Sequence, residues 1–144
     1  MGQKVHPTGF RLGISTEYTS KWYAGSKDYS SYLLEDYRIR EYLKKQLENA
    51  SVSKIVIERP TKEAVVNIYT SRPGIVIGKK GEDIEKFRNK IASILNTDKA
   101  TVKVNVKEIK KPELDAQLVA EGSTQQLERR IMYRRAMKRA VTNT

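Results

Sequence analysis

Two glycines and two lysines, in the order Gly78, Lys79, Lys80 and Gly81, form the segment of this chain best suited to hold a ligand. An apolar run precedes them and a helical pattern follows them, which predicts a loop between two helices. Glycine has no Cβ, so a phosphate group can approach the main chain closely there. The N–H groups that open the following helix point toward the loop and carry partial positive charge. The segment is therefore suited to hold the phosphates of a polyanion.

The same segment lacks the spacing of a nucleotide-binding loop. A P-loop has four residues between its glycines, then Gly-Lys and a hydroxyl residue for magnesium. Here three residues separate Gly74 from Gly78, and Lys80 stands where the hydroxyl would be. A dinucleotide-binding Gly-x-Gly-x-x-Gly fingerprint is missing its first close pair. An enzyme that uses nucleotides is therefore disfavoured.

Two acids, Glu82 and Asp83, follow the loop directly. Acids in the first turn of a helix complement its dipole, which explains them better than acid–base catalysis does. They also cancel the local charge of the two lysines. Attraction for a polyanion must then come from the loop geometry together with surrounding basic residues.

The composition points to a polyanionic partner and away from several other classes. The 144 residues carry 28 Lys and Arg against 17 Asp and Glu, a formal charge of +11. Nucleic acid and a membrane surface are both polyanions, but no run approaches the roughly 20 apolar residues that span a bilayer. Cysteine is absent and His6 is the only histidine, so thiolate metal sites and histidine-based triads are excluded. We expect no metal, no cofactor, no small-molecule substrate, no membrane association and no enzymatic activity.

The elements that must position the loop follow from hydrophobic periodicity. The pattern predicts, in order, a helix at 29–49, strands at 52–59 and 63–71 joined by a turn at 60–62, a short apolar helical turn before the loop, a helix at 84–95 and a strand at 101–107. The first helix has an expected apolar arc of Leu33, Tyr37, Ile39, Leu43, Leu47 and Ala50. The last strand alternates between an inward set of Val102, Val104 and Val106 and an outward set of Lys103, Asn105 and Lys107.

This order of elements gives the Gly-x-x-Gly loop a specific context. The loop alone also occurs at ordinary helix–loop–helix turns. Set in the order helix, strand, strand, short helix, loop, helix, strand, it matches the prokaryotic, type II KH domain, in which the loop clamps a nucleic-acid backbone. The predicted fold class is α+β, with a three-stranded mixed sheet packed by helices and with Gly78 to Gly81 as the RNA-binding loop.

Residues 1–28 are predicted to be an irregular extension in which aromatic and basic side chains alternate. The aromatic residues are Phe10, Tyr18, Trp22 and Tyr23, and the basic ones are Lys4, Arg11, Lys21 and Lys27. One interpretation is that the aromatic rings dock onto the body of the protein. The other is that the extension lies on RNA, with bases or ribose against the rings. The two interpretations are compatible.

The C-terminal part begins after a boundary at Lys110-Lys111-Pro112. The pattern predicts a short helix at 113–120 and a longer basic helix at 121–141, with Gly122 near its start. No acid occurs among positions 129–139, which hold six cations: Arg129, Arg130, Arg134, Arg135, Lys138 and Arg139. Such a run is often just a solvated face, but like charges at i,i+4 spacing repel, and a polyanion would relieve that repulsion.

Five segments together resemble one family. They are MGQKVHPTGFRLGI at 1–14, SVSKIVIERP at 51–60, RPGIVIGKKG at 72–81, KPELDA at 111–116 and QLERRIMYRRAMKRAV at 126–141. The chain is similar there to bacterial-type small ribosomal subunit protein three. The resemblance implies a type II KH domain in the head of the small subunit, bound to small-subunit rRNA and to neighbouring head proteins. It implies a ribosomal, cytoplasmic location, or an organellar ribosome.

The resemblance also assigns residues. The positions that match the family's basic mRNA contacts, where mRNA enters the subunit, are Arg134, Arg135 and Lys138, and the further basic face consists of Arg129, Arg130 and Arg139. Contacts with rRNA are expected at Lys4, His6, Arg11, Lys21, Trp22 and Arg72.

Three regions are expected: the extension 1–28, the KH domain 29–110 and a helical region 111–144. Family members continue into a second α/β domain, and 111–144 corresponds to its start. A free KH protein that binds single-stranded RNA in transcription or ribosome assembly is the alternative function.

Overall fold

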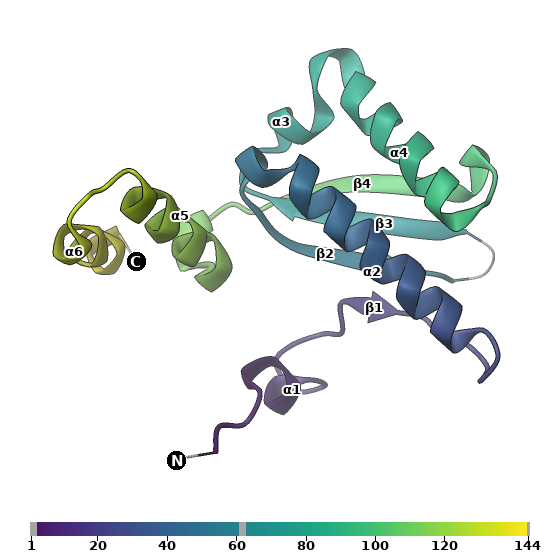
Figure 1. Cartoon of the computed structure of the whole chain (residues 1–144), viewed down its shortest axis with the longest axis horizontal. Coiled ribbons are helices and arrows are strands. Elements are labelled where there is room, and N and C mark those ends of the chain that lie inside the picture. Colours follow the sequence, from purple (N-terminus) through teal and green to yellow (C-terminus); the bar gives the residue numbers. More distant parts are fainter. Residues whose placement is uncertain (1–2, 61–62, 144) are drawn as a thin grey trace.

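The structure is a computed structural model that describes residues 3–60 and 63–143, except for the side chain of Lys80. The predicted turn at 60–62 therefore lies partly outside the described residues. The elements are α1 (Pro7–Arg11), β1 (Ser20–Lys21), α2 (Tyr29–Gln46), β2 (Val52–Glu58), β3 (Ala64–Thr70), α3 (Pro73–Ile77), α4 (Glu82–Leu95), β4 (Val102–Glu108), α5 (Ala116–Glu128) and α6 (Tyr133–Asn143), with 3-10 turns at Glu48–Ala50, Lys79–Gly81, Lys99–Thr101 and Pro112–Leu114 (Figure 1).

The sheet is mixed and its strands lie in the order β1-β2-β3-β4. Strands β2 and β3 are antiparallel, whereas β3 and β4 are parallel and are joined across α3, the loop and α4. This arrangement confirms the α+β class and the three predicted strands. The fourth strand, β1, pairs parallel to β2 over only two residues, which is too short to leave a periodic pattern in the sequence.

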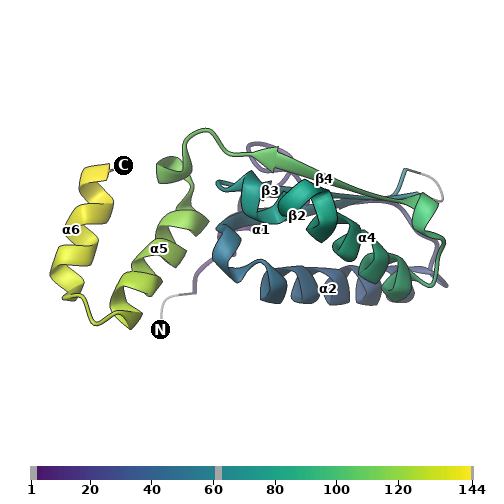
Figure 2. The ribbon, with the colours of Figure 1, turned by 90° about the horizontal axis from the view of Figure 1, so that it is seen from above.

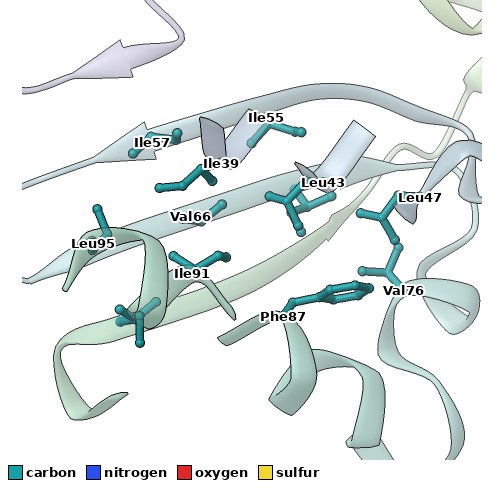
Figure 3. Close-up of a cluster of buried hydrophobic side chains, with 14 of the residues drawn as sticks. Ile39, Leu43, Leu47, Ile55, Ile57, Val66, Val76, Phe87, Ile91 and Leu95 are labelled. Atoms are coloured by element: carbon teal, nitrogen blue, oxygen red, sulfur yellow. The ribbon is translucent and has the colours of Figure 1, made fainter. Parts of the chain in front are cut away.

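Helices α2 and α4 cover one face of the sheet, and α5 and α6 lie beyond one of its ends (Figure 2). The core between helices and sheet contains Ile39 and Leu43 of α2, Val66 of β3 and Ile91 of α4, all fully buried (Figure 3). Burying a side chain of this size contributes on the order of 1.5–3 kcal/mol. The alternation of β4 is confirmed, because its valines face this core while Lys103, Asn105 and Lys107 are exposed.

The expected apolar arc of α2 is partly wrong. Ile39, Leu43, Leu47 and Ala50 are buried, but Leu33 and Tyr37 are 49% and 64% exposed. At ~100° per residue, the buried residues fall within a narrower arc, and Leu33 and Tyr37 lie outside it. The buried position in the N-terminal half of the helix is instead Asp36.

Asp36 is buried because it connects the N-terminal extension to the sheet. Its Oδ2 accepts hydrogen bonds from Ser20 Oγ (2.9 Å) and Trp22 Nε1 (2.8 Å), and its Oδ1 accepts one from Arg59 (2.8 Å). A buried carboxylate is tolerated only when donors surround it in this way. Burial alone would lower the pKa of Arg59, but its hydrogen bonds to Asp36 and Glu35 outweigh that effect and raise it. The cluster fastens β1 and Trp22 against α2.

The predicted helices at 113–120 and 121–141 are wrong in their boundaries. Helix α5 begins after Asp115, whose carboxylate accepts from the N–H groups of Gln117 and Leu118, and it runs through Gly122. The break comes at Arg130, which has a left-handed φ of 60°. The N–H of Arg130 bonds to Leu127 O and that of Ile131 to Gln126 O, the pattern of a Schellman motif. Arginine takes the place that glycine usually holds there, so the sequence did not mark this break.

Candidate nucleic-acid interface

The Gly-x-x-Gly loop lies between α3 and α4, as predicted. Helix α3 ends with the N–H of Gly78 bonded to Gly74 O (3.1 Å), and residues Lys79–Gly81 form a 3-10 turn that leads into α4. Gly78 has φ 72° and ψ −175°, a region that is essentially restricted to glycine. Gly81 has φ 83° and ψ 9°, the left-handed region that Asn also tolerates. The two glycines thus fix the turn by different conformations.

Gly78 is also required by a side chain that packs against it. A Cβ added at Gly78 would lie 2.1 Å from Asp83 Oδ2 and 2.9 Å from Asp83 Cβ. A Cβ at Gly81 would meet nothing within 4 Å. The first glycine of the loop therefore allows α4 to begin directly beside the main chain, whereas the second only supplies backbone freedom.

Two lysines at the loop differ in whether they pair with an acid. Lys86 Nζ donates to Asp83 Oδ1 (2.9 Å), and this hydrogen bond raises the pKa of Lys86. Lys79 is exposed and has no ion pair among the described residues. An open hollow of about 500 Å³ lies beside the loop and is lined by Gly74, Gly78, Lys79, Asp83 and Lys86, among others. Its charged lining consists of Lys79 and Lys86 together with Glu82 and Asp83. Lys80 belongs to the same loop, but its side chain lies outside the described part.

The candidate residues of the N-terminal extension make contacts within the chain. His6 Nδ1 accepts from the N–H of Gly9 (3.0 Å) and caps α1, while the Arg11 guanidinium donates to Pro7 O (2.9 Å). Lys21 pairs with Glu17; their hydrogen bond lowers the pKa of Glu17 and raises that of Lys21. Lys4 is exposed. None of these contacts uses every donor of the side chain, so contacts of these residues with RNA stay a prediction.

The aromatic residues of the extension divide between the two interpretations. Trp22 is half-buried: it donates to Asp36 and packs against Tyr29 and Tyr32 at ring-centroid distances of 5.6 and 5.7 Å. Phe10, Tyr18 and Tyr23 are mostly exposed. The docking interpretation therefore holds for Trp22, and the three exposed rings are the residues to which the RNA interpretation still applies.

The C-terminal candidates fall on two different features. Arg134, Arg135 and Lys138 lie on α6, where Arg134 and Lys138 are one turn apart and Arg134 Nε donates to Tyr133 OH (3.1 Å). The further basic face does not lie on a single helix: Arg129 and Arg130 occupy the turn after α5, while Arg139 lies on α6. Arg130 and Arg134 are four residues apart in the sequence, but they do not lie on one helix and so do not form an i,i+4 pair.

Sequence reasoning missed two parts of this interface. One is the packing of Asp83 against Gly78. It was missed because the position of the Asp83 side chain, five residues after Gly78, depends on where α4 begins. The other is the cluster of Asp36, Arg40 and Arg59, where Arg40 donates to Thr19 O (3.0 Å) and Ser20 Oγ (2.6 Å). Balanced charges on α2 concealed it, although an acid on the apolar side of a helix was a usable signal.

Within residues 3–60 and 63–143, no helix is long and apolar enough to cross a membrane. In the same part of the chain, no group of three or more His, Cys, Asp or Glu side chains is placed to hold a metal ion.

A Gly-x-x-Gly turn between two helices, inserted between neighbouring parallel strands of a mixed sheet, defines the type II KH class of RNA-binding fold. A family profile described as "KH domain" matches residues 38–114. The chain belongs to the KH domain family.

Individual relatives narrow the comparison. The chain is 57% identical over 143 residues to the small ribosomal subunit protein uS3 of Paracidovorax citrulli (strain AAC00-1), covering 99% of this chain and 48% of the relative. It is 59% identical over 143 residues to the proteins of the same name from Pseudoalteromonas translucida (strain TAC 125) and Alkalilimnicola ehrlichii (strain ATCC BAA-1101 / DSM 17681 / MLHE-1). Each of those alignments covers 99% of this chain, and 60% and 62% of the respective relative. The chain thus spans about half to three-fifths of the length of these proteins.

Proposed function

We propose that this chain is a non-enzymatic structural constituent of the small ribosomal subunit that binds small-subunit rRNA through its KH domain. The observation that carries the proposal is the loop at Gly78 to Gly81, whose first glycine has a backbone conformation and a neighbour that admit no other residue. The likeness to proteins named uS3 along 99% of the chain supports the ribosomal setting. Bacterial relatives favour ribosomes of the cytoplasm.

The finer proposal concerns mRNA. Arg134, Arg135 and Lys138 are exposed on α6 and lie within about one turn of each other. Three cations at this spacing can hold successive phosphates of a strand that passes the helix. If that strand is mRNA entering the subunit, the helix keeps it single and disfavours re-pairing, while translocation supplies the work. No ATP site is needed for this role. Neighbouring head proteins are the remaining proposed partners.

A free KH protein acting in transcription or ribosome assembly is the alternative. The basic and aromatic extension favours the ribosome, because Trp22, Ser20 and Arg40 fasten it to the KH domain as a defined surface. Sedimentation in high salt separates the two functions. A ribosomal constituent remains with the small subunits, whereas a free RNA-binding protein is released to the top of the gradient. Release in high salt would therefore contradict the proposal.

A further inference from the structure

A groove of about 650 Å³ lies between the end of the sheet and the helices α5 and α6. Helix α5 is held against the sheet by a hydrogen bond from Ser53 Oγ of β2 to Asp115 Oδ2 (2.6 Å). The segment before it is held by the N–H of Ile109, which bonds to Thr70 O (2.9 Å). The groove is therefore formed by contacts within the fold and belongs to neither the loop nor the exposed face of α6.

Three arginines from separate parts of the sequence line this groove. Arg72 lies between β3 and α3, Arg129 ends α5 and Arg139 lies on α6. From the sequence, Arg72 is expected to contact rRNA and the other two to form part of a basic face, with no reason to expect the three together. The fold places all three around one hollow.

These arginines differ from those of the core in having no partner. Arg59 is held by Glu35 and Asp36, and Arg88 Nε donates to the main-chain oxygens of Lys99 and Val102. Among the described residues, the guanidinium groups of the three groove arginines form no hydrogen bond or ion pair. Their guanidinium groups are therefore available to an anion that enters the groove.

The rest of the lining also suits a nucleic-acid backbone. Ser71, Gln126 and Asn143 add side chains that can donate to phosphate or to a ribose hydroxyl. Two acids are present, Glu113 and Glu121, of which Glu121 accepts a hydrogen bond from Gln117 (2.8 Å). Three arginines against two acids leave an excess of positive charge, and guanidinium forks match phosphate oxygens in geometry.

The position of the groove connects the two basic features already described. Arg72 precedes α3, whose other end is Gly78, and this helix has five residues, so it is about 7.5 Å long at 1.5 Å per residue. Arg139 lies one turn after Arg135 on α6. A strand held by the loop can therefore continue past α3 into the groove and from there reach α6.

We propose that this groove binds backbone phosphates of single-stranded RNA, on the same strand that the Gly-x-x-Gly loop holds. The inference rests on the proposed RNA-binding function and adds a second subsite to it. The ligand is the phosphodiester backbone, without preference for a base.

The test removes two charges from the groove and two from elsewhere. Arg129→Gln with Arg139→Gln alters the groove but keeps side chains that donate hydrogen bonds. Arg38→Gln with Lys45→Gln, on the exposed side of α2, is the matched control. Affinity for a single-stranded oligonucleotide is measured over a series of salt concentrations, with circular dichroism to verify folding.

Each phosphate contact contributes a slope of about −0.7 to the dependence of log affinity on log salt for single strands. We therefore expect the groove variant to lower the magnitude of the slope by about 1.4, and the control to stay near the unaltered chain. Equal slopes for both variants would overturn the groove subsite while leaving the loop function intact. Replacement of Lys79 by Gln is measured in the same way. If the groove variant lowers the slope but the Lys79 variant does not, the claim that the groove and the loop hold the same strand is wrong. Absence of RNA binding by the unaltered chain would overturn both.

A second readout uses the absence of cysteine from the chain. Gln126→Cys carries a photo-crosslinker into the groove, and Ser93→Cys carries it to the exposed side of α4 as a control. We expect RNA crosslinks from position 126 to exceed those from position 93 several-fold. Crosslinks from position 126 to a protein partner in reconstituted subunits, in place of RNA, would overturn the proposal.

Discussion

At the scale of single residues, Gly78 combines a backbone requirement with a packing requirement. Its φ of 72° with ψ of −175° excludes residues that have a Cβ, and Asp83 fills the space that a Cβ would need. Asp83 in turn neutralises Lys86. Among the described side chains of the loop, Lys79 is thereby left as an exposed cation without an ion pair, beside a main chain that a phosphate can reach.

Gly78→Ala should therefore destabilise the protein by about 2–3 kcal/mol, because backbone strain adds to displacement of Asp83. Gly81→Asn, at a left-handed position with open space, should change the free energy of unfolding by under about 1 kcal/mol. Urea unfolding of both variants measures the difference. Adding Asp83→Ala should recover part of the loss at Gly78. Equal stability of Gly78→Ala and the unaltered chain would show that the loop relaxes without cost.

Asp36 is the residue whose removal should have the largest effect on the extension. Asp36→Ala removes the acceptor of the hydrogen bonds from Ser20, Trp22 and Arg59 and leaves Glu35 as the remaining charge partner of Arg59, so we expect a loss of about 3 kcal/mol. Glu41→Ala, an exposed acid on the same helix, should stay within about 0.5 kcal/mol. Trp22 is the only tryptophan, so its fluorescence also reports undocking of the extension. Matching results for the two variants would contradict the role of Asp36.

At the scale of elements, α5 and α6 depend on a turn that arginine and not glycine forms. The Schellman motif at Arg130 ends α5, and α6 then begins at Tyr133 with its basic residues on a helix of its own. This separation divides the cations into a turn that contributes to the groove and a helix that presents Arg134, Arg135 and Lys138. The two groups can then contact different parts of one RNA strand.

Changing Arg134, Arg135 and Lys138 together to Ala should slow translation of a structured mRNA more than that of an unstructured one. The reason is that these cations are proposed to hold the incoming strand in its single-stranded form. The ratio of the two rates in reconstituted ribosomes is the measurement. Equal slowing of both messages, or failure of the subunit to assemble, would favour a face that binds rRNA only.

The elements differ in how far the sequence predicted them. Strand β4 was predictable because its valines and polar residues alternate without interruption, and the loop was predictable because two glycines flank two lysines between helical patterns. Strand β1 was not predictable, because two residues are too few to show an alternating pattern. Its position also depends on the hydrogen bond from Ser20 to Asp36, which only the fold reveals. The break at Arg130 was missed because arginine, and not glycine, holds the left-handed position there.

At the scale of the whole molecule, the basic residues behind the net charge of +11 divide into those that bind partners within the fold and those that do not. Arg59 and Arg88 are bound inside the fold by carboxylates and main-chain oxygens. Among the described residues, the side chains of Lys79 and of the three groove arginines have no ion pair and are available to an external polyanion. The position of the loop at Gly78 to Gly81 between two helices could thus be predicted from the sequence. The assembly of Arg72, Arg129 and Arg139 around one groove required the fold, because Arg72 lies far from the other two in the chain.

The central claim is that the Gly-x-x-Gly loop clamps an RNA backbone, and one measurement tests it directly. The affinity of the chain with Lys79→Asp and Lys80→Asp for single-stranded RNA is compared with that of a charge-matched control, Arg38→Asp with Lys45→Asp. Both glycines are kept, so the fold should be unchanged by circular dichroism. We predict that the loop variant binds at least about tenfold more weakly than the control, a difference of about 1.4 kcal/mol. Equal affinities of the two variants, with unchanged spectra, would contradict the clamp.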